Sequence, residues 1–244
     1  MLSDMKRLLV LVAVMYGVTA GIFWVAATNT TVLYPSSDSY SWESVPEANN
    51  GGSDNFAITS FATNPKNMRG WIAFPIQEIP NDMWIVNAKL RLRIWHKTTA
   101  AEAGDTTGRI YGAYRLTQAW DEYSVNWANQ PNYSEEHHAT SAVPPGQGGW
   151  EGPPLYMDWD ITEIVRDWLS GTPNHGVLIR DTQENATVEY STQFFQHSEK
   201  VPDASYYPRL IVTYVSPQAI GIFAAALIVE GLFITFLWRR KRTK

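Results

Sequence analysis

Two long apolar segments near the ends of the chain constrain its architecture more than any other feature. Residues 8–27 (LLVLVAVMYGVTAGIFWVAA) contain no charged residue, and residues 220–238 (IGIFAAALIVEGLFITFLW) contain one, Glu230. About 20 predominantly apolar residues in a helix are enough to cross the hydrocarbon core of a bilayer. The sequence therefore predicts two transmembrane helices, at residues 8–27 and 218–238, with membrane lipid as their surroundings.

The charges beside these segments predict their orientation. Residues 1–7 end in Lys-Arg, and the tail at 239–244 (RRKRTK) holds five of the 19 basic residues of the chain. Because cytoplasmic flanks of membrane helices are rich in Lys and Arg, we expect both termini in the cytoplasm and residues 28–217 outside the cell membrane. The alternative for the first segment is a signal peptide cleaved after Ala27, although the apolar run is longer than a usual h-region.

The composition of residues 28–217 excludes several classes of function. These 190 residues hold 12 basic and 22 acidic side chains, a net charge of −10. Such a charge argues against nucleic acid as a partner, because cationic contacts to phosphate supply that affinity. The chain has no cysteine, which excludes thiolate catalysis, Cys-ligated zinc and iron–sulfur clusters. Without cysteine the domain has no disulfides, but a domain of this size can be stabilised by the burial of apolar side chains alone.

Residues 28–217 consist of short apolar runs separated by turn-rich clusters. In AKLRLRIW (88–95), Ala88, Leu90, Leu92 and Ile94 alternate with polar or aromatic residues, as in a half-buried antiparallel strand. Further runs lie at 69–76, 109–116, 155–161, 176–180, 186–190 and 209–215. Many short strands with Gly, Pro and Asn turns favour an all-β fold, a β-sandwich or jelly roll.

Residues 160–171 (DITEIVRDWLSG) have the period of a helix instead. Their apolar residues recur at intervals of three and four, and Asp160 is the expected N-cap with Glu163 three positions later. Gly171 is the expected C-terminal stop. The sequence thus predicts one short helix that covers one side of the sandwich.

The segment AWDEYSVNWANQP (119–131) carries two tryptophans and two adjacent carboxylates. It can be read as a catalytic cleft, a surface for sugar stacking, or a packing motif. On a strand, Asp121 and Glu122 would point to opposite faces, so they could not flank one scissile bond. Packing is the preferred interpretation, and sugar stacking is the alternative. In the packing interpretation, Trp120, Val125 and Trp127 belong to the core, and Asn126, Asn129 and Pro131 form the turn.

Six motifs in this order resemble one family. After Asp38-Ser-Tyr and Asn49-Asn-Gly come the 119–131 segment, the DITEIVRDW helix (160–168), FQHSE (195–199) and YPRLIVTY (207–214). The chain is similar, over roughly residues 32–215, to DNRLRE-type domains, also classed as carbohydrate-binding module family 96. The resemblance implies a jelly-roll β-sandwich of cell-surface and polysaccharide-associated proteins, without a catalytic constellation of its own.

Three tryptophans outside the apolar pattern are candidates for a glycan site. Trp95 shares a strand face with Arg91 and Arg93, an arrangement that suits an acidic sugar. Trp42 and Trp150 lie in turn-rich segments. Each ring has an alternative role, as cover for one end of the sandwich or as a contact with another subunit.

Oxygen-bearing residues near one another suggest a calcium site. Asp38, Asn49, Asn50 and Asp54 flank two glycines, and hard cations prefer oxygen ligands. An Asx/Gly turn needs the same residues and is the alternative. No other cofactor is expected. His137 and His138 lie in a run read as a solvated polar loop, and no residues form an acid–base or nucleophile set, so no enzymatic activity is expected.

Two further features concern the surface and the membrane segments. Asn29, Asn132 and Asn185 begin N-glycosylation sequons. Glu230 lies near the middle of its apolar segment, where a carboxylate normally faces a partner or water, and Gly17 and Gly21 have the spacing that lets helices approach closely. A neutral glutamic acid in a simple anchor remains the alternative.

Two functions are therefore consistent with the sequence. The first is a membrane-anchored, non-catalytic surface module that binds carbohydrate or mediates adhesion. The second is a structural subunit of a larger membrane or cell-envelope protein assembly.

Overall fold

The computed structural model describes residues 28–62, 66–80, 82–97, 105–149, 153–197, 201, 203–220, 228, 231 and 235. The predicted membrane segments, with Gly17, Gly21 and Glu230, lie outside the described residues apart from a few positions. Across the described ranges, no helix combines the length and apolarity needed to span a bilayer.

The chain divides into two compact units. One contains residues 1–30, 80–86 and 213–244, and the other contains residues 31–79 and 87–212. The second unit holds most of the described strands and the depression described below.

The described strands form one sheet. Their bounds are β1 Thr28–Leu33, β2 Ser37–Trp42, β3 Asn55–Ser60, β4 Met68–Ala73, β5 Trp84–Lys97, β6 Ile110–Leu116, β7 Tyr133–Ala142, β8 Tyr156–Asp160, β9 Val177–Asp181, β10 Tyr190–Phe195 and β11 Arg209–Val215. The helix α2 covers Thr162–Leu169, and the 3-10 turns η1 and η2 cover Ile76–Glu78 and Ala204–Tyr206. Residues 217–220 are also helical.

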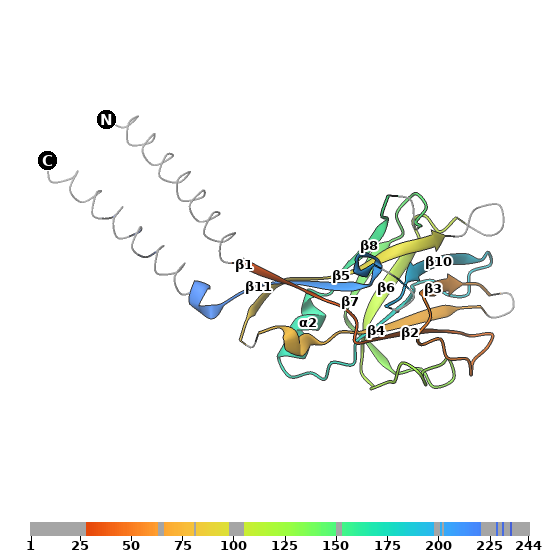
Figure 1. The fold of residues 1–244 in the computed structure, drawn as a ribbon, viewed down its shortest axis with the longest axis horizontal. Helices are drawn as coiled ribbons and strands as arrows, with labels where there is room; N and C mark the ends of the chain where they lie inside the picture. Colours follow the sequence, from red (N-terminus) through yellow and green to blue (C-terminus); the bar gives the residue numbers. More distant parts are fainter. Residues whose placement is uncertain are drawn as a thin grey trace, which may run out of the picture. The chain divides into compact units, whose positions relative to one another are not determined.

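The strand order is β1-β11-β5-β10-β3-β4-β9-β6-β7, with β2 beside β4 and β8 beside β5 (Figure 1). The pairs β3–β10, β2–β4, β4–β9, β5–β8 and β6–β9 are antiparallel. Where β3 meets β4 only Thr59 and Met68 are paired. The expected all-β class with one short helix between strands is confirmed, as a curled, mostly antiparallel sheet.

Strand β6 faces strands β3, β8 and β10 across the core. Tyr111 of β6 is fully buried, and its hydroxyl donates to Thr192 Oγ1 of β10 at 2.9 Å. The Trp159 indole N–H of β8 donates to the Tyr111 carbonyl at 2.8 Å. Phe56 and Phe194 pack beside these rings, with centroids 5.5 Å apart. These contacts join β6 to β3, β8 and β10, so the fold is sandwich-like in its layering.

Strand β5 confirms the predicted alternation on its core face. Ala88, Leu90, Leu92 and Ile94 are all fully buried. The opposite face differs from a solvated one, because Arg93 is also buried, at 6 % exposure. Its guanidinium lies 3.7 Å from the ring centroid of Tyr206 in η2. The alternation within β5 could not predict that η2 covers Arg93, since η2 is more than 100 residues away in sequence.

Two predicted elements were misplaced. The run containing His137 and His138 is not a loop but strand β7, most of whose side chains are exposed. A strand exposed on both faces has no apolar alternation to reveal it. The strand predicted at 186–190 lies instead at Tyr190–Phe195, and β1, β2 and β3 were not predicted.

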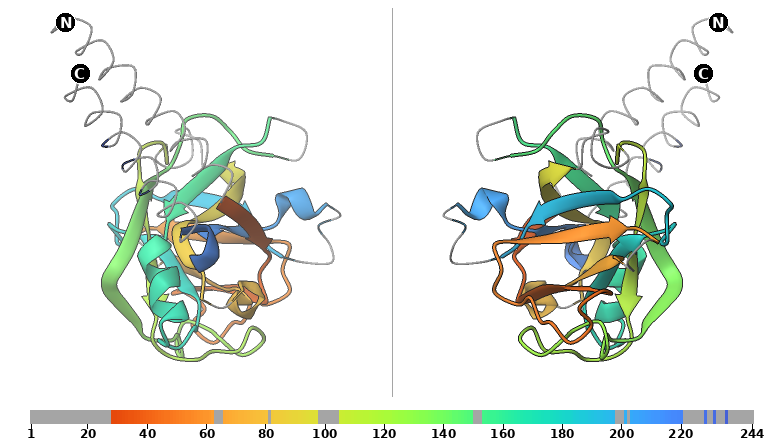
Figure 2. Two further views of the ribbon diagram at one scale, coloured as in Figure 1. Left: turned by 90° about the vertical axis from the view of Figure 1, so that its left-hand side faces the viewer. Right: turned by 90° about the vertical axis from the view of Figure 1, so that its right-hand side faces the viewer.

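The predicted helix is confirmed as α2, which lies beside β7 (Figure 2). Its N-cap position is Ile161, not Asp160, but the Asp160 carboxylate still accepts the Thr162 backbone N–H at 3.1 Å. Gly171 follows the helix with a φ of +111°, a left-handed conformation that favours glycine. Trp168 and the other buried residues of α2 lie on its core side.

Removing the Tyr111 hydroxyl tests the hydrogen bond across the core. We expect Tyr111→Phe to lower the free energy of unfolding by about 1–2 kcal/mol, because Thr192 loses a buried partner. Tyr123→Phe is the control, since Tyr123 is 69 % exposed, and should change stability by less than about 0.5 kcal/mol. Chemical denaturation of both variants measures the difference. Equal effects would show that the bond does not stabilise the core.

Candidate functional site

The segment 119–131 packs against a second apolar cluster on the outer face of the sheet. Val125 is buried there with Trp71 of β4, Leu178 of β9, and Tyr114 and Leu116 of β6, and Trp120 packs against the cluster. The Trp120 indole N–H also donates to the His175 carbonyl at 2.8 Å. The preferred interpretation of this segment as a packing motif is therefore supported for Trp120 and Val125.

Asparagines shape the turn that follows, as the sequence predicted. The Asn126 side chain accepts the backbone N–H groups of Ala128 at 3.0 Å and Asn129 at 3.1 Å. The Asn129 side chain accepts the Asn126 N–H at 2.7 Å and donates to the Ser124 carbonyl. Trp127 is half-buried under the Arg69 guanidinium, 4.8 Å from its ring centroid.

The two adjacent carboxylates have separate structural roles. They lie in a turn, not on the strand considered in the sequence argument. Asp121 Oδ1 accepts the Tyr123 N–H at 3.1 Å. Burial raises the pKa of Glu122, although the backbone N–H groups of Asp38 and Gly52 donate to its carboxylate and lower it. Each carboxylate thus satisfies backbone donors of a turn or a strand edge.

A second loop interlocks with this segment. The Asn49 amide of that loop donates to the carbonyls of Glu122 at 2.8 Å and Val125 at 2.7 Å. A Cβ on Gly51 would lie 2.3 Å from the Glu122 carbonyl oxygen, so the two backbones are in direct contact. The position therefore requires glycine for steric reasons.

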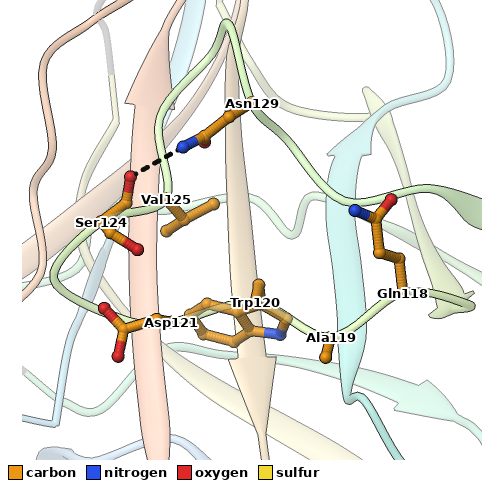
Figure 3. Close-up of a pocket in the computed structure, with 7 residues that line it drawn as sticks. All are labelled: Gln118, Ala119, Trp120, Asp121, Ser124, Val125 and Asn129. Carbon is orange, nitrogen blue, oxygen red and sulfur yellow. Dashed lines mark hydrogen bonds between the residues drawn. The ribbon is translucent and has the colours of Figure 1, made fainter.

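A shallow depression opens beside these residues. Its volume is about 430 Å³, and its lining residues are Gln118, Ala119, Trp120, Asp121, Ser124, Val125 and Asn129. Figure 3 shows the polar side chains of Gln118, Asp121 and Asn129 around those of Trp120 and Val125. A concave surface with an aromatic ring and a few polar groups is a typical arrangement for binding a small ligand.

The predicted cationic site on β5 is largely engaged within the protein. Arg91 forms a bidentate ion pair with Asp158, at 2.7 Å for each of the two bonds. Arg93 donates to the Gly149 carbonyl at 3.0 Å, and Trp95 is stacked on Phe195 with centroids 5.7 Å apart. The structure does bring Arg91, Arg93 and Trp95 to one face, and their role in glycan binding stays a prediction.

The other predicted tryptophans are separate from this face. Trp42 ends β2 and is half-buried beside Tyr40, with ring centroids 6.4 Å apart. Trp150 lies outside the described residues.

The predicted calcium ligands have hydrogen-bond partners within the protein, and two of them act as donors. Asn49 bonds the neighbouring segment as described, and the Asn50 amide donates to the Tyr40 carbonyl at 3.1 Å. Asp54 Oδ1 accepts the Asn55 amide at 3.0 Å. The Asn49 carboxamide oxygen accepts the Gly51 N–H at 3.1 Å, which is the Asx turn considered as the alternative.

Asp38 differs from the other three, because it is completely buried. Its Oδ2 accepts the His197 backbone N–H at 2.7 Å. Burial raises the pKa of Asp38 well above its ordinary value, and this hydrogen bond only partly opposes that effect. Within the described residues, no group of three or more His, Cys, Asp and Glu side chains has the arrangement of a metal site.

The remaining candidates lie on the surface. His137 contacts Asp167 of α2, with Nδ1 and Oδ2 3.0 Å apart, and His138 stacks on Tyr114. Asn29 and Asn132 are exposed, as is Asn185, whose side-chain oxygen accepts the Asn67 amide at 2.8 Å. Whether the sequons carry glycans stays a prediction.

An ion-pair network on the outer face was not predicted. Arg69 donates to Glu184 at 2.6 and 2.7 Å, and Arg180 lies 3.4 Å from the same carboxylate. Arg180 also lies over the Tyr114 ring, 5.0 Å from its centroid. The sequence could have predicted only part of this network. Arg69 and Arg180 both occupy predicted strands, but nothing in the sequence pattern pairs them with Glu184.

Comparison with known proteins supports the expected family. A model of carbohydrate-binding module family 96 matches residues 29–200. No curated protein matches the chain. The matched region spans β1 to β10 and includes both the depression and the interlocked loops, so the chain belongs to carbohydrate-binding module family 96.

Proposed function

We propose that the protein binds carbohydrate, without catalysing its cleavage, at the depression formed by residues 118–129. Membership of a carbohydrate-binding family supports the function, and the depression supports the location. Trp120 is the observation that carries the proposal. Its indole is fixed by the bond to His175 and by the cluster beneath it, and a fixed aromatic ring is a suitable surface for the apolar face of a sugar.

The polar groups around the ring favour a neutral glycan. Gln118 and Ser124 present an amide and a hydroxyl to the depression, and Asp121 presents a carboxylate. These groups match the donors and acceptors of sugar hydroxyls. Among these described lining residues none is cationic, whereas the alternative β5 face holds Arg91 and Arg93, which suit an acidic sugar.

Affinity electrophoresis of the full-length protein in mild detergent tests this site. We expect retardation in gels containing a neutral β-glucan, and Gln118→Ala should weaken the apparent affinity about five- to tenfold, the effect of one lost hydrogen bond. Thr117→Ala, at the exposed neighbouring position, is the control and should bind like wild type.

The same gels distinguish the two candidate faces. Retardation only by an acidic polysaccharide, lost in Trp95→Ala but retained in Gln118→Ala, would place the site on β5 instead. No retardation by any neutral or acidic polysaccharide would refute carbohydrate binding. Because Trp95 stacks on Phe195, the thermal midpoint of Trp95→Ala must be measured beside its binding.

We further propose that the module is displayed on the outer surface of a cell membrane, with both termini in the cytoplasm. The apolar segments 8–27 and 220–238 and their basic flanks support this topology. Protease added to intact cells should cleave within residues 28–217 and leave the tail at 239–244 intact. Cleavage of the tail from outside would contradict the orientation.

The second candidate function is that of a subunit in a membrane or cell-envelope assembly, and Glu230 favours it. A carboxylate in mid-membrane costs a few kcal/mol on insertion scales, with no gain for a simple tether. A hydrogen bond to a neighbouring helix returns only about 0.6–2 kcal/mol, so close packing along Gly17 and Gly21 would add to it.

Native electrophoresis in mild detergent tests the assembly. We expect the wild type to migrate as a multi-chain complex, Glu230→Leu and Gly17→Leu to weaken that complex, and the control Val229→Leu to leave it unchanged. A wild type that is monomeric in several mild detergents, with crosslinking in native membranes unaffected by Glu230→Leu, would contradict the assembly.

A further inference from the structure

Trp84, the first residue of β5, presents a large aromatic ring at the protein surface. It is 59 % exposed, whereas every other described tryptophan is buried or half-buried. The next residue, Ile85, is 2 % exposed and belongs to the core. Because successive side chains of a strand point to opposite faces, the burial of Ile85 turns Trp84 away from the core.

Trp84 belongs to the compact unit to which both predicted membrane segments are attached. Residues 80–86 form this unit with residues 1–30 and 213–244. In the sheet order β11 lies between β1 and β5, and Thr213 Oγ1 of β11 lies 3.3 Å from Thr30 Oγ1 of β1. The beginning of β1, the end of β11 and the beginning of β5 are therefore neighbours in one unit.

The two chain connections set how far this unit can lie from a bilayer that the predicted segments span. Strand β1 begins at Thr28, directly after segment 8–27, and only residues 216 and 217 separate the end of β11 at Val215 from the predicted helix at 218–238. A strand rises by about 3.3 Å per residue. The headgroup region is roughly 5–8 Å thick on each side of the hydrocarbon core. The first residues of β1 would then lie among the headgroups.

We propose that the exposed ring of Trp84 lies in the headgroup region of the bilayer and forms a third contact of the protein with lipid, between the ends of the two predicted spans. This inference rests on the membrane topology proposed above. An indole suits that layer, because its apolar body faces the acyl chains while its N–H reaches polar groups. Ile220, in the same unit and 36 % exposed, adds apolar surface at this end of the module.

A contact at Trp84 would restrict the orientation of this unit on the membrane. The chain connections at β1 and β11 lie on adjacent strands, about 5 Å apart in the sheet. Trp84 lies on β5, on the other side of β11. The lipid contact therefore widens the base from one strand spacing to two, which opposes tilting of these three strands within the plane of their sheet. This effect is independent of whether the depression binds sugar.

Spin labelling of the full-length protein in phosphatidylcholine vesicles tests this contact. The chain has no cysteine, so one introduced cysteine is the sole labelling site. We expect a nitroxide on Trp84→Cys to collide more often with O₂, which concentrates in the bilayer, than with a water-soluble nickel chelate. Val32→Cys is the matched control, because Val32 is also exposed but lies four residues beyond Thr28 on β1, about 13 Å along the strand. Its label should show the reverse order.

Quenching of the native ring gives a second measurement without a label. Lipids brominated near the headgroup end of their acyl chains quench an indole that lies at that depth. We expect the emission lost on adding such lipids to be smaller in Trp84→Phe than in the wild type. Trp127→Phe, which removes a half-buried ring outside this unit, is the matched control and should lose as much emission as the wild type.

Flotation of the same samples separates this proposal from the topology on which it rests. A protein that does not float with the vesicles refutes both. A protein that floats, but whose label at position 84 behaves like the label at position 32, refutes the lipid contact alone and leaves Trp84 facing water or another protein. A label in lipid without any quenching of the native ring would show that the nitroxide inserts by itself, and it would also overturn the proposal.

Discussion

The packing of residues 119–131 on the outer face of β4, β9 and β6 is the contact on which the candidate site depends. Trp71 and Leu178 point away from the main core and are nevertheless buried, because Val125 and Trp120 cover them. The depression is thus a surface of a packed layer and not of a free loop. The loop containing Asn49 and Gly51 then rests on that layer through the carbonyls of Glu122 and Val125.

Sequence patterns predicted those helices and strands that bury one face within a single continuous segment of the chain. The alternation in β5 and the helical period of α2 are of this kind, since each buries one face of a regular element. The 119–131 turn was also predictable, because Asn126 and Asn129 satisfy the backbone within a few residues. Strand β7 was not, because it is exposed on both faces and is paired only with β6.

The candidate sites were predicted less well, because they depend on contacts between distant residues. The alternation in β5 predicts that Arg91 and Arg93 are exposed cations. In the fold, η2 covers Arg93 and Asp158 pairs with Arg91. Asp38 could be singled out from its type and neighbours, but the residues that donate hydrogen bonds to it, Gln196 and His197, are 158 and 159 residues away. The orientation of an amide, as donor or acceptor, is likewise set by the fold: Asn49 and Asn50 carry the right atoms for calcium but use their N–H groups.

The exposed strand β7 has a consequence for the way in which copies of this protein meet one another. It is the last strand in the sheet order, and terminal strands invite pairing with strands of neighbouring molecules. The register between β6 and β7 shifts between Ala113 and Arg115, and opposite this shift His137 adopts a φ of +57°. Exposed Glu135 and Glu136 add two negative charges at the same place. An irregular, charged margin of this kind opposes edge-to-edge association, so neighbouring copies can be crowded together without forming a continuous sheet.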